Sequence, residues 1–288
     1  MLNNKIISIC ERKFIYLNYS KRTAEIYLHY IKIFLKSFPE QQIIHLNSND
    51  FQNYLDNYKF TSSVQQNQVI NAIRFLYKYG LDRKYDKVNF VRPKKEQRLP
   101  SVLSKEEISR LFKVIKNTKH KLILAIIYSA GLRVSEVINL KWSDIDKSRG
   151  VIWVRQGKGA KDRQTPLSEI VICLLLKYCG EYKITSKDKE GYVFRGQNNA
   201  EQYTAKSIQQ FLKDYAKKAG INKRVHPHLI RHNYATHLYE QGTDLKFIQD
   251  TLGHKNSKTT SIYVHMSTFH ISQMKTPLDS LYACRASI

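Results

Sequence analysis

LGHKNSKTTSIY, at residues 252–263, is the stretch that decides how this chain is interpreted, because of what precedes it. Three shorter segments lie upstream: AGLRVSE at residues 130–136, GKG at 157–159 and HPHLIRH at 226–232. Together they supply two arginines, a lysine and several histidines ahead of Tyr263. A tyrosine that follows such a set of cations is a candidate nucleophile facing a phosphate group.

Taken singly, each of these features also has an ordinary structural explanation. Arg133 and Glu136 have the spacing of an ion pair on a helix surface. Lys158 fits a basic turn, and its two glycines lack the GxxxxGK[ST] pattern of a nucleotide-binding loop. The occurrence of all candidates in one order favours a joint catalytic role for Arg133, Lys158, His228, Arg231, His254 and Tyr263.

The candidate residues match what cleavage of a phosphodiester requires. The attacking oxygen must be placed in line, the charge on the non-bridging oxygens must be held, and the leaving oxygen needs a proton. Arginine suits the second task because its planar fork binds phosphate bidentately and keeps its charge. His228 and Arg231 are three residues apart on a predicted helix, so both can present donors from one turn. Lys158, in a hairpin turn, is a candidate general acid.

A zinc site at the histidine-rich segment is the alternative. His228 and His232 have the spacing of the two histidines in HExxH, but the glutamate is missing and Arg231 lies beside them. A cation on the same face disfavours a metal ion, so we expect neither metal nor cofactor. We expect His232, Tyr234 and His237 to pack or to support the site.

The charge of the chain points to a polyanionic partner. The 288 residues carry 48 Lys and Arg against 24 Asp and Glu, a formal net charge of +24. Such an excess favours nucleic acid, although a compositional bias towards lysine would also produce it. Four scattered cysteines show no metal-ligand spacing and fit a reducing cytoplasm. We expect no signal peptide, because the N-terminus lacks a proper h-region and a cleavage site. We also expect no membrane partner, because the longest apolar run, residues 122–130, is about half a membrane span.

Residues 1–88 are predicted to form a compact helical domain. Apolar residues recur at helical spacing from Thr23 to Leu35, and again from Phe51 to Tyr58, where Ser48 or Asn49 is the expected cap. A third helix is expected over residues 62–79, ending at Gly80. Residues 89–103 contain two prolines and an excess of positive charge without periodicity, which indicates a linker.

Residues 104–288 are predicted to form a second, mainly helical domain with a small β-hairpin. Ser104 and Glu107 have the spacing of a capping box, and Val151–Val154 is a short β-favouring run. The hairpin turn carries Lys158, and the chain returns through Arg163–Thr165. Helices are expected at about residues 105–116, 119–130, 168–179, 204–219, 227–239, 245–252 and 257–264, and Gly131 is expected to end the second of them.

The segments GLRVSE, GKG, HLIRH and LGH…Y together resemble the tyrosine recombinase (phage integrase) family, most closely its Xer-like branch. The resemblance is strong over about residues 100–268 and weaker in the N-terminal helices, which resemble the core-binding domain. It implies an α+β catalytic domain behind a helical core-binding domain. It also implies site-specific recombination of DNA in the cytoplasm, at the nucleoid, through a 3′-phosphotyrosyl intermediate on Tyr263, without metal or ATP. Arg133, Arg231 and His254 would hold the phosphate, His228 would assist, and Lys158 would protonate the leaving 5′ oxygen.

The resemblance further implies an inverted-repeat site on double-stranded DNA, a homotetramer in the synaptic complex, and an accessory or directionality protein as a further partner. A topoisomerase-like nicking enzyme, a non-enzymatic DNA-binding module and a metal-dependent nuclease remain alternatives. The sequence leaves open the target site. It also leaves open whether the role is chromosome-dimer resolution, integration of a mobile element or inversion.

Overall fold

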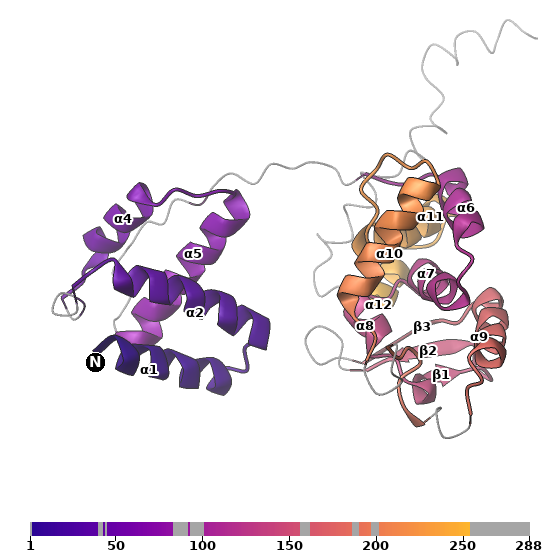
Figure 1. Cartoon of the computed structure of the whole chain (residues 1–288), viewed down its shortest axis with the longest axis horizontal. Coiled ribbons are helices and arrows are strands. Elements are labelled where there is room, and N and C mark those ends of the chain that lie inside the picture. The colour runs from indigo at the N-terminus through magenta and orange to yellow at the C-terminus, as the bar shows by residue number, and fades with distance from the viewer. Residues whose placement is uncertain are drawn as a thin grey trace, which may run out of the picture. The chain divides into compact units, whose positions relative to one another are not determined.

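The computed structural model describes residues 2–39, 43, 45–82, 92, 101–155, 162–185, 190–196 and 202–253. Backbone contacts divide the chain into two compact units, Met1–Gln97 and Arg98–Ile288 (Figure 1). The first unit is helical, and the second packs helices around a three-stranded sheet. No helix in the described part of the chain combines the length and the apolar character that crossing a membrane requires.

In the described residues, the N-terminal unit consists of helices that end in a π-turn. Helices α1 (Leu2–Tyr16) and α2 (Lys21–Lys36) pack together, and α5 (Ser63–Phe75) contacts α2. The periodicity predicted α2, α4 (Ser48–Asn57) and α5, but the cap of α4 was wrong. Asn47 caps this helix, because its Oδ1 accepts from the backbone N–H of Asn49 and Asp50 while Asp50 accepts from the N–H of Asn47.

The predicted stop at Gly80 has a structural reason. The third helix of the sequence analysis continues past α5 as the π-turn η1 (Leu76–Gly80), which packs on α1. A Cβ at Gly80 would lie 2.8 Å from Leu76 Cδ1 and 2.9 Å from Cys10 Sγ, so the close packing of this turn on α1 favours glycine. Arg92, in the segment predicted as linker, donates to Asn67 and Asn71 of α5.

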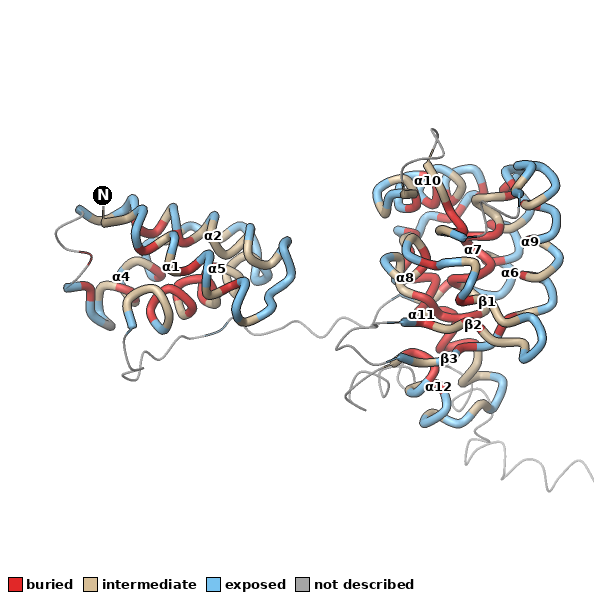
Figure 2. The backbone as a smooth tube through the Cα atoms, turned by 90° about the horizontal axis from the view of Figure 1, so that it is seen from below, coloured by how far each residue is buried: buried red, intermediate tan, exposed pale blue. Residues whose placement is uncertain are grey.

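The core of the N-terminal unit is rich in aromatic rings. Phe34 stacks on Phe51 at a centroid distance of 5.0 Å, and Phe14 stacks on Phe75 at 3.8 Å. Both Phe34 and Phe51 are fully buried. In Figure 2 the buried positions face the inside of the helical unit, and the exposed ones form its outer surface. Burial of these rings therefore stabilises this unit together with the aliphatic side chains of the same core.

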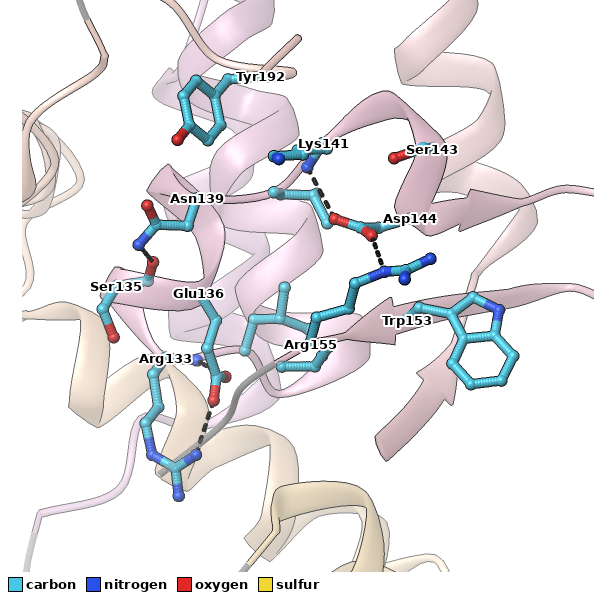
Figure 3. A pocket seen from close by; sticks show the side chains of 13 residues that line it. Arg133, Ser135, Glu136, Asn139, Lys141, Ser143, Asp144, Trp153, Arg155 and Tyr192 are labelled. Carbon is cyan, nitrogen blue, oxygen red and sulfur yellow. Dashed lines mark hydrogen bonds and ion pairs between the residues drawn. The ribbon is translucent and has the colours of Figure 1, made fainter. Parts of the chain in front are cut away.

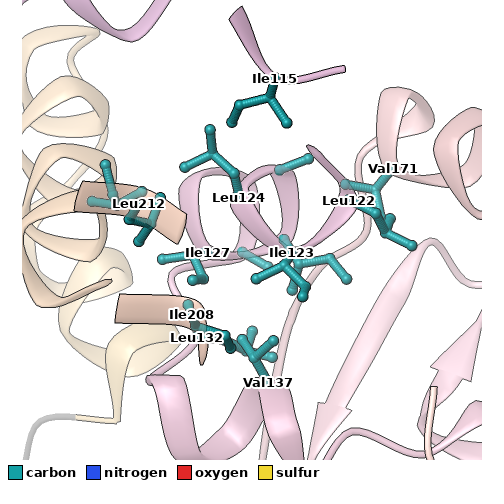
Figure 4. Packing of buried hydrophobic residues seen from close by; sticks show 14 of the residues in the cluster. Ile115, Leu122, Ile123, Leu124, Ile127, Leu132, Val137, Val171, Ile208 and Leu212 are labelled. Atoms are coloured by element: carbon teal, nitrogen blue, oxygen red, sulfur yellow. The ribbon is translucent and has the colours of Figure 1, made fainter. Parts of the chain in front are cut away.

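The second unit begins with two predicted helices. The Ser104–Glu107 capping box is confirmed and opens α6 (Lys105–Val114). Helix α7 (Thr118–Ala130) ends as predicted at Gly131, which is left-handed with φ +62°. Nearly every position of α7 from Leu122 to Ala130 is buried, so this apolar run is the central core helix (Figure 4).

The sheet and the remaining helices surround α7. The sheet is antiparallel, in the order β1 (Ile145–Asp146), β2 (Val151–Val154) and β3 (Arg163–Pro166). The hairpin strands β2 and β3 were predicted, whereas β1 was not, because two residues carry no periodic signal. Short turns α8 (Val134–Ile138) and η2 (Trp142–Asp144) lead into the sheet. The later helices are α9 (Glu169–Glu181), α10 (Ala205–Lys218), α11 (Pro227–Glu240) and α12 (Leu245–Leu252).

Helix α11 spans the inside of the second unit and anchors the segment where this unit begins. Its N-terminus is capped by His226, with Pro227 in the first turn. Asn233 accepts from the backbone N–H of Leu103 at 3.2 Å, and His237 Nε2 lies 3.0 Å from the Leu103 carbonyl oxygen. His237 and Tyr234 are buried, as expected for packing residues.

Candidate functional site

Two arginines that lie far apart in the sequence meet at the end of α12. Arg133, at the start of α8, donates from Nη2 to the Leu252 carbonyl at 3.3 Å. Arg231, from the middle of α11, donates from Nη2 to the same oxygen at 2.6 Å. Arg231 also donates from Nη1 to the carbonyl of Gly131, the residue that ends α7. The last carbonyls of a helix carry partial negative charge, which favours this gathering of cations.

A single carboxylate, that of Glu136, organises these arginines. Arg133 Nη1 donates to Glu136 Oε1 at 2.7 Å, and Arg231 Nη1 lies 3.6 Å from Glu136 Oε2 (Figure 3 shows the first pair). The Glu136 side chain also accepts from the backbone N–H of Arg133 at 2.7 Å. The pairing of Arg133 with Glu136 was expected from their spacing, but the contact with Arg231 was not.

A third arginine completes the cluster. Arg163, on β3, donates through Nη1 and Nη2 to the two oxygens of Glu136 at 2.9 and 2.7 Å. Its Nε donates to the Thr251 carbonyl at 2.7 Å. Arg163 is not among the site residues predicted from the sequence. A signal for it exists, because strand alternation places Arg163 on the same face as Thr165, which is buried.

The charges in this cluster do not balance. Burial by itself would raise the pKa of Glu136, but hydrogen bonds and charges from Arg163 and Arg133 outweigh it and lower the pKa to about 2. The carboxylate is therefore ionised at neutral pH. Three guanidinium groups surround it, so the cluster keeps an excess of positive charge. Such an excess suits an anionic ligand.

His228 lies one turn before Arg231 on the same helix. Partial desolvation by the surrounding protein lowers its pKa, and the charges of Arg231 and Arg133 lower it further. The spacing of three residues on α11 places His228 on the same side of the helix as Arg231, and the residue is exposed. Burial lowers the pKa of the neighbouring His232 to about 4, with contributions from His228, Arg231 and His226. Both rings are therefore neutral at pH 7.

The other predicted site residues, Lys158, His254 and Tyr263, lie outside the described residues, as does the helix expected at residues 257–264. Their sequence neighbours are described. Strands β2 and β3 end and begin on either side of the segment that carries Lys158. Gly253, left-handed with φ +63°, precedes His254 and gives its carbonyl to Arg133 Nη2 at 3.5 Å.

A pocket of about 870 Å³ lies next to Arg133 and Glu136, between α8, η2 and β2 (Figure 3). Arg155 crosses it and donates to Asp144 at 2.8 Å. A second groove, of about 1000 Å³, lies between α10 and the start of α11. Its lining contains a concentration of basic side chains: Lys206, Lys213, Lys217, Lys223, Arg224, His226 and His228.

Two family models match the chain. Residues 101–270 match the phage integrase family, and residues 9–87 match the N-terminal SAM-like domain of phage integrases. The two ranges confirm the predicted fold class, a helical core-binding domain followed by an integrase catalytic domain.

Curated proteins and solved structures give the same result. Tyrosine recombinase XerA of Pyrococcus horikoshii is 38% identical over 72% of this chain and 71% of its own length. Tyrosine recombinase XerA of Thermococcus kodakarensis is 34% identical over 88% of this chain and 87% of its own. The crystal structure of XerH site-specific recombinase, in a post-cleavage complex with its palindromic difH substrate, superimposes with a TM-score of 0.73. It covers 94% of this chain and 83% of the XerH chain at 21% identity, which shows a shared fold.

Proposed function

The chain belongs to the phage integrase family, as an Xer-like tyrosine site-specific recombinase that cleaves and rejoins DNA, and we propose that its active site consists of Arg133, Lys158, His228, Arg231, His254 and Tyr263. The observation that carries this proposal is the convergence of Arg133 and Arg231 on one carbonyl oxygen, that of Leu252. The chain continues from that point through Gly253 to His254 and Tyr263. Two cations that bind phosphate are thus held at the start of the segment with the nucleophile.

The reaction follows from these side chains. The Tyr263 hydroxyl attacks the scissile phosphorus, forming a phosphotyrosyl bond to the 3′ side while the bond from phosphorus to the 5′ oxygen breaks. Arg133, Arg231 and His254 hold the non-bridging oxygens, where negative charge grows in the transition state. Lys158 gives its proton to the leaving 5′ oxygen. The phosphotyrosyl bond conserves the energy of the broken bond, so rejoining needs neither ATP nor a metal ion.

His228 would act in its neutral form. A free tyrosine has a pKa near 10, so its proton must pass to a base as the attack proceeds. The lowered pKa of His228 leaves its ring neutral at pH 7, able to accept that proton or to donate a hydrogen bond to a phosphate oxygen. Its exposure beside two arginines supports this assignment.

The basic groove between α10 and α11 is the proposed DNA surface of the catalytic domain. Lys206, Lys213 and Lys217 repeat on α10 at intervals of seven and four residues. Helical geometry places such residues along one side of the helix. His228 belongs both to this groove and to the arginine cluster. A duplex in the groove would therefore bring its backbone to the proposed catalytic residues.

We further propose residues 1–88 as the core-binding domain, 89–103 as the linker and 104–288 as the catalytic domain. The two domains would bind one half of an inverted-repeat site, and four copies would form the synaptic complex, with an accessory protein setting direction. The protein would act at the nucleoid in the cytoplasm. XerH, of the same fold, was crystallised on a palindromic substrate, which supports a symmetric site.

The test is a covalent trap in the presence of EDTA. The protein is incubated with nicked genomic DNA from its source organism and denatured, and the protein-linked DNA is sequenced. We expect linked DNA that shares an inverted-repeat sequence, and none from Tyr263→Phe, which retains DNA binding in a mobility-shift assay. Equal linkage by Tyr263→Phe would show that another residue is the nucleophile. Linkage that EDTA abolishes would contradict the metal-free mechanism.

A further inference from the structure

Arg163 connects three parts of the second unit that lie far apart in the sequence. Its side chain is 9% exposed and its three nitrogens all donate, two to Glu136 and one to the Thr251 carbonyl. On β3 it pairs with Val154, at the base of the hairpin whose turn carries Lys158. Thr251 lies in the last turn of α12. Arg163 thus belongs to the base of the hairpin, and its side chain links this base to the arginine cluster and to the end of α12.

The fit around Arg163 is close. A Cβ built on Gly253 would lie 3.0 Å from Arg163 Cδ and 3.4 Å from its Nε. Gly253 also has a left-handed backbone, so two independent constraints favour glycine there. The turn that leads from α12 towards His254 therefore runs against the Arg163 side chain.

Glu136 shows what Arg163 contributes. This carboxylate has contacts at 2.7 to 2.9 Å with Arg163 and one of 2.7 Å with the Arg133 side chain, whereas Arg231 lies 3.6 Å away. If Arg163 were absent, the buried carboxylate would keep its charge and would need new donors. Among the residues that the structure describes, Arg133 and Arg231 are the other cations in contact with it. Both arginines would then pair with Glu136 and would no longer be available to bind a phosphate.

We propose that Arg163 is a positioning residue for DNA cleavage: it satisfies Glu136, so that the charges of Arg133 and Arg231 act on the scissile phosphate. This inference rests on the proposed function, in which those two arginines are the phosphate ligands. Arg163 itself does not touch the DNA in this role. Lysine cannot replace it, because one ammonium group cannot reach both Glu136 oxygens and the Thr251 carbonyl in the geometry of a guanidinium fork.

The experiment measures single-turnover cleavage of a nicked target site, with protein in excess of DNA, so that binding does not limit the rate. We expect Arg163→Met and Arg163→Lys each to slow cleavage about 100-fold, the size of effect that a small misplacement of catalytic groups produces. Arg155→Met is the matched control. It removes an arginine from the adjacent strand end, where Arg155 pairs with Asp144, and we expect a rate within about 3-fold of wild type.

A double variant separates positioning from support of the fold. In Glu136→Gln/Arg163→Met the carboxylate that competes for Arg133 and Arg231 is gone, while the amide oxygen can still accept from Arg133. We expect this double variant to cleave at least 10-fold faster than Arg163→Met alone. A purely structural role would make the second substitution neutral or harmful.

The outcomes are distinguishable. Wild-type rates for Arg163→Met, or a double variant no faster than the single one, would overturn the inference. Arg231→Ala is included to test its foundation: if that variant cleaves as fast as wild type, the proposed phosphate ligands are wrong. If Arg231→Ala is inactive and Arg163→Met is normal, only the role of Arg163 fails. Thermal unfolding of each variant, followed by tryptophan fluorescence, confirms that the rates come from folded protein.

Discussion

The core of the N-terminal unit is buried and the arginine cluster at the end of α12 is largely shielded from solvent, but different forces hold them. In the first, rings such as Phe34 and Phe51 stack on each other from two helices that are close in the sequence. In the second, Arg163 and Glu136 come from a strand and a short helix, and Arg163 also donates to a carbonyl of a third element, α12. Apolar burial is non-directional, whereas a buried ion pair is favourable only with its hydrogen bonds complete.

This difference indicates which kind of substitution each region tolerates. Loss of one ring from the aromatic core removes a limited area of buried apolar surface, and it leaves no unpaired charge in the protein interior. Loss of one partner from the cluster leaves a charge that must recruit another, so the effect spreads to the remaining residues. A substitution in the first region should therefore mainly change the stability of the protein, and one in the second should mainly change the rate of DNA cleavage. Both tryptophans, Trp142 and Trp153, are in the second unit, so fluorescence reports on that unit alone.

Phe34→Ala tests the aromatic core and should have the largest effect on stability. Phe34 is fully buried, stacks on Phe51 and contacts Tyr54 edge-to-face at 4.7 Å. Removing such a ring costs about 3–5 kcal/mol. In urea we expect far-UV circular dichroism to show an early loss of helix, while the tryptophan transition of the second unit stays in place.

Val64→Ala is the control for that experiment, because Val64 lies in the same unit with 65% of its side chain exposed. We expect its two transitions to match those of wild type within about 0.5 kcal/mol. A tryptophan transition that moves together with the loss of helix in Phe34→Ala would show that the two units unfold as one, and the contrast between them would not hold.

Gly131→Ala probes the cluster through its backbone. Gly131 is left-handed, its carbonyl accepts from Arg231, and a Cβ there would lie 2.5 Å from the Tyr234 ring. The left-handed backbone and the overlap together should cost about 2–4 kcal/mol, and the displaced carbonyl should also slow DNA cleavage. Tryptophan fluorescence in urea measures the first effect, and single-turnover cleavage the second.

Gly220→Ala isolates the backbone contribution. Gly220 has nearly the same φ, +65°, but a Cβ there meets no atom within 4 Å. We expect a loss of about 1 kcal/mol in the free energy of unfolding, measured by tryptophan fluorescence in urea. If Gly131→Ala destabilises the protein no more than Gly220→Ala, then Tyr234 yields to the added methyl group and the site is less rigid than its contacts indicate.

The same contrast explains how far the sequence could be interpreted. Helical periodicity identified the N-terminal helices, and the Ser104 capping box and Gly131 marked helix ends, because these signals are local. Strand β1 escaped, because two residues cannot show a period. The cap of α4 was misplaced because three consecutive polar residues, Asn47 to Asn49, can each act as a cap, and only the tertiary setting selects one.

At the site, the sequence could name residues but could not connect them. Arg133 and Arg231 were selected from their motifs, yet nothing local says that both donate to Leu252 or that Glu136 contacts both. Arg163 was passed over because a charged residue in a short strand is usually a solvent-facing one. Such contacts depend on the packing of β3, α8 and α12, which is a property of the whole unit.

Acidification should have a smaller effect on stability than Phe34→Ala or Gly131→Ala, and it should act on the second unit. Burial lowers the pKa of His232 to about 4, and the pKa values of His226, His228 and His237, on the same helix or at its cap, are lowered too. A lowered histidine pKa means that the folded state prefers the neutral ring. Stability is therefore complete above about pH 6.5 and declines as the pH falls towards 4. His232 alone accounts for about 2 kcal/mol at pH 5.

In the N-terminal unit the resolved shifts act at the opposite end of the pH scale. Burial raises the pKa of Tyr54 to about 12. The stability linked to this shift is therefore fully present below about pH 10 and is lost as the pH rises towards 12. Between pH 7.5 and 5 we therefore expect the urea midpoint reported by tryptophan to fall, and that of the aromatic core to change less. His232→Gln should flatten the tryptophan response by about half or more. An unchanged slope in that variant would mean that other histidines carry the acid sensitivity, and that His232 is less desolvated than its half-buried position on α11 implies.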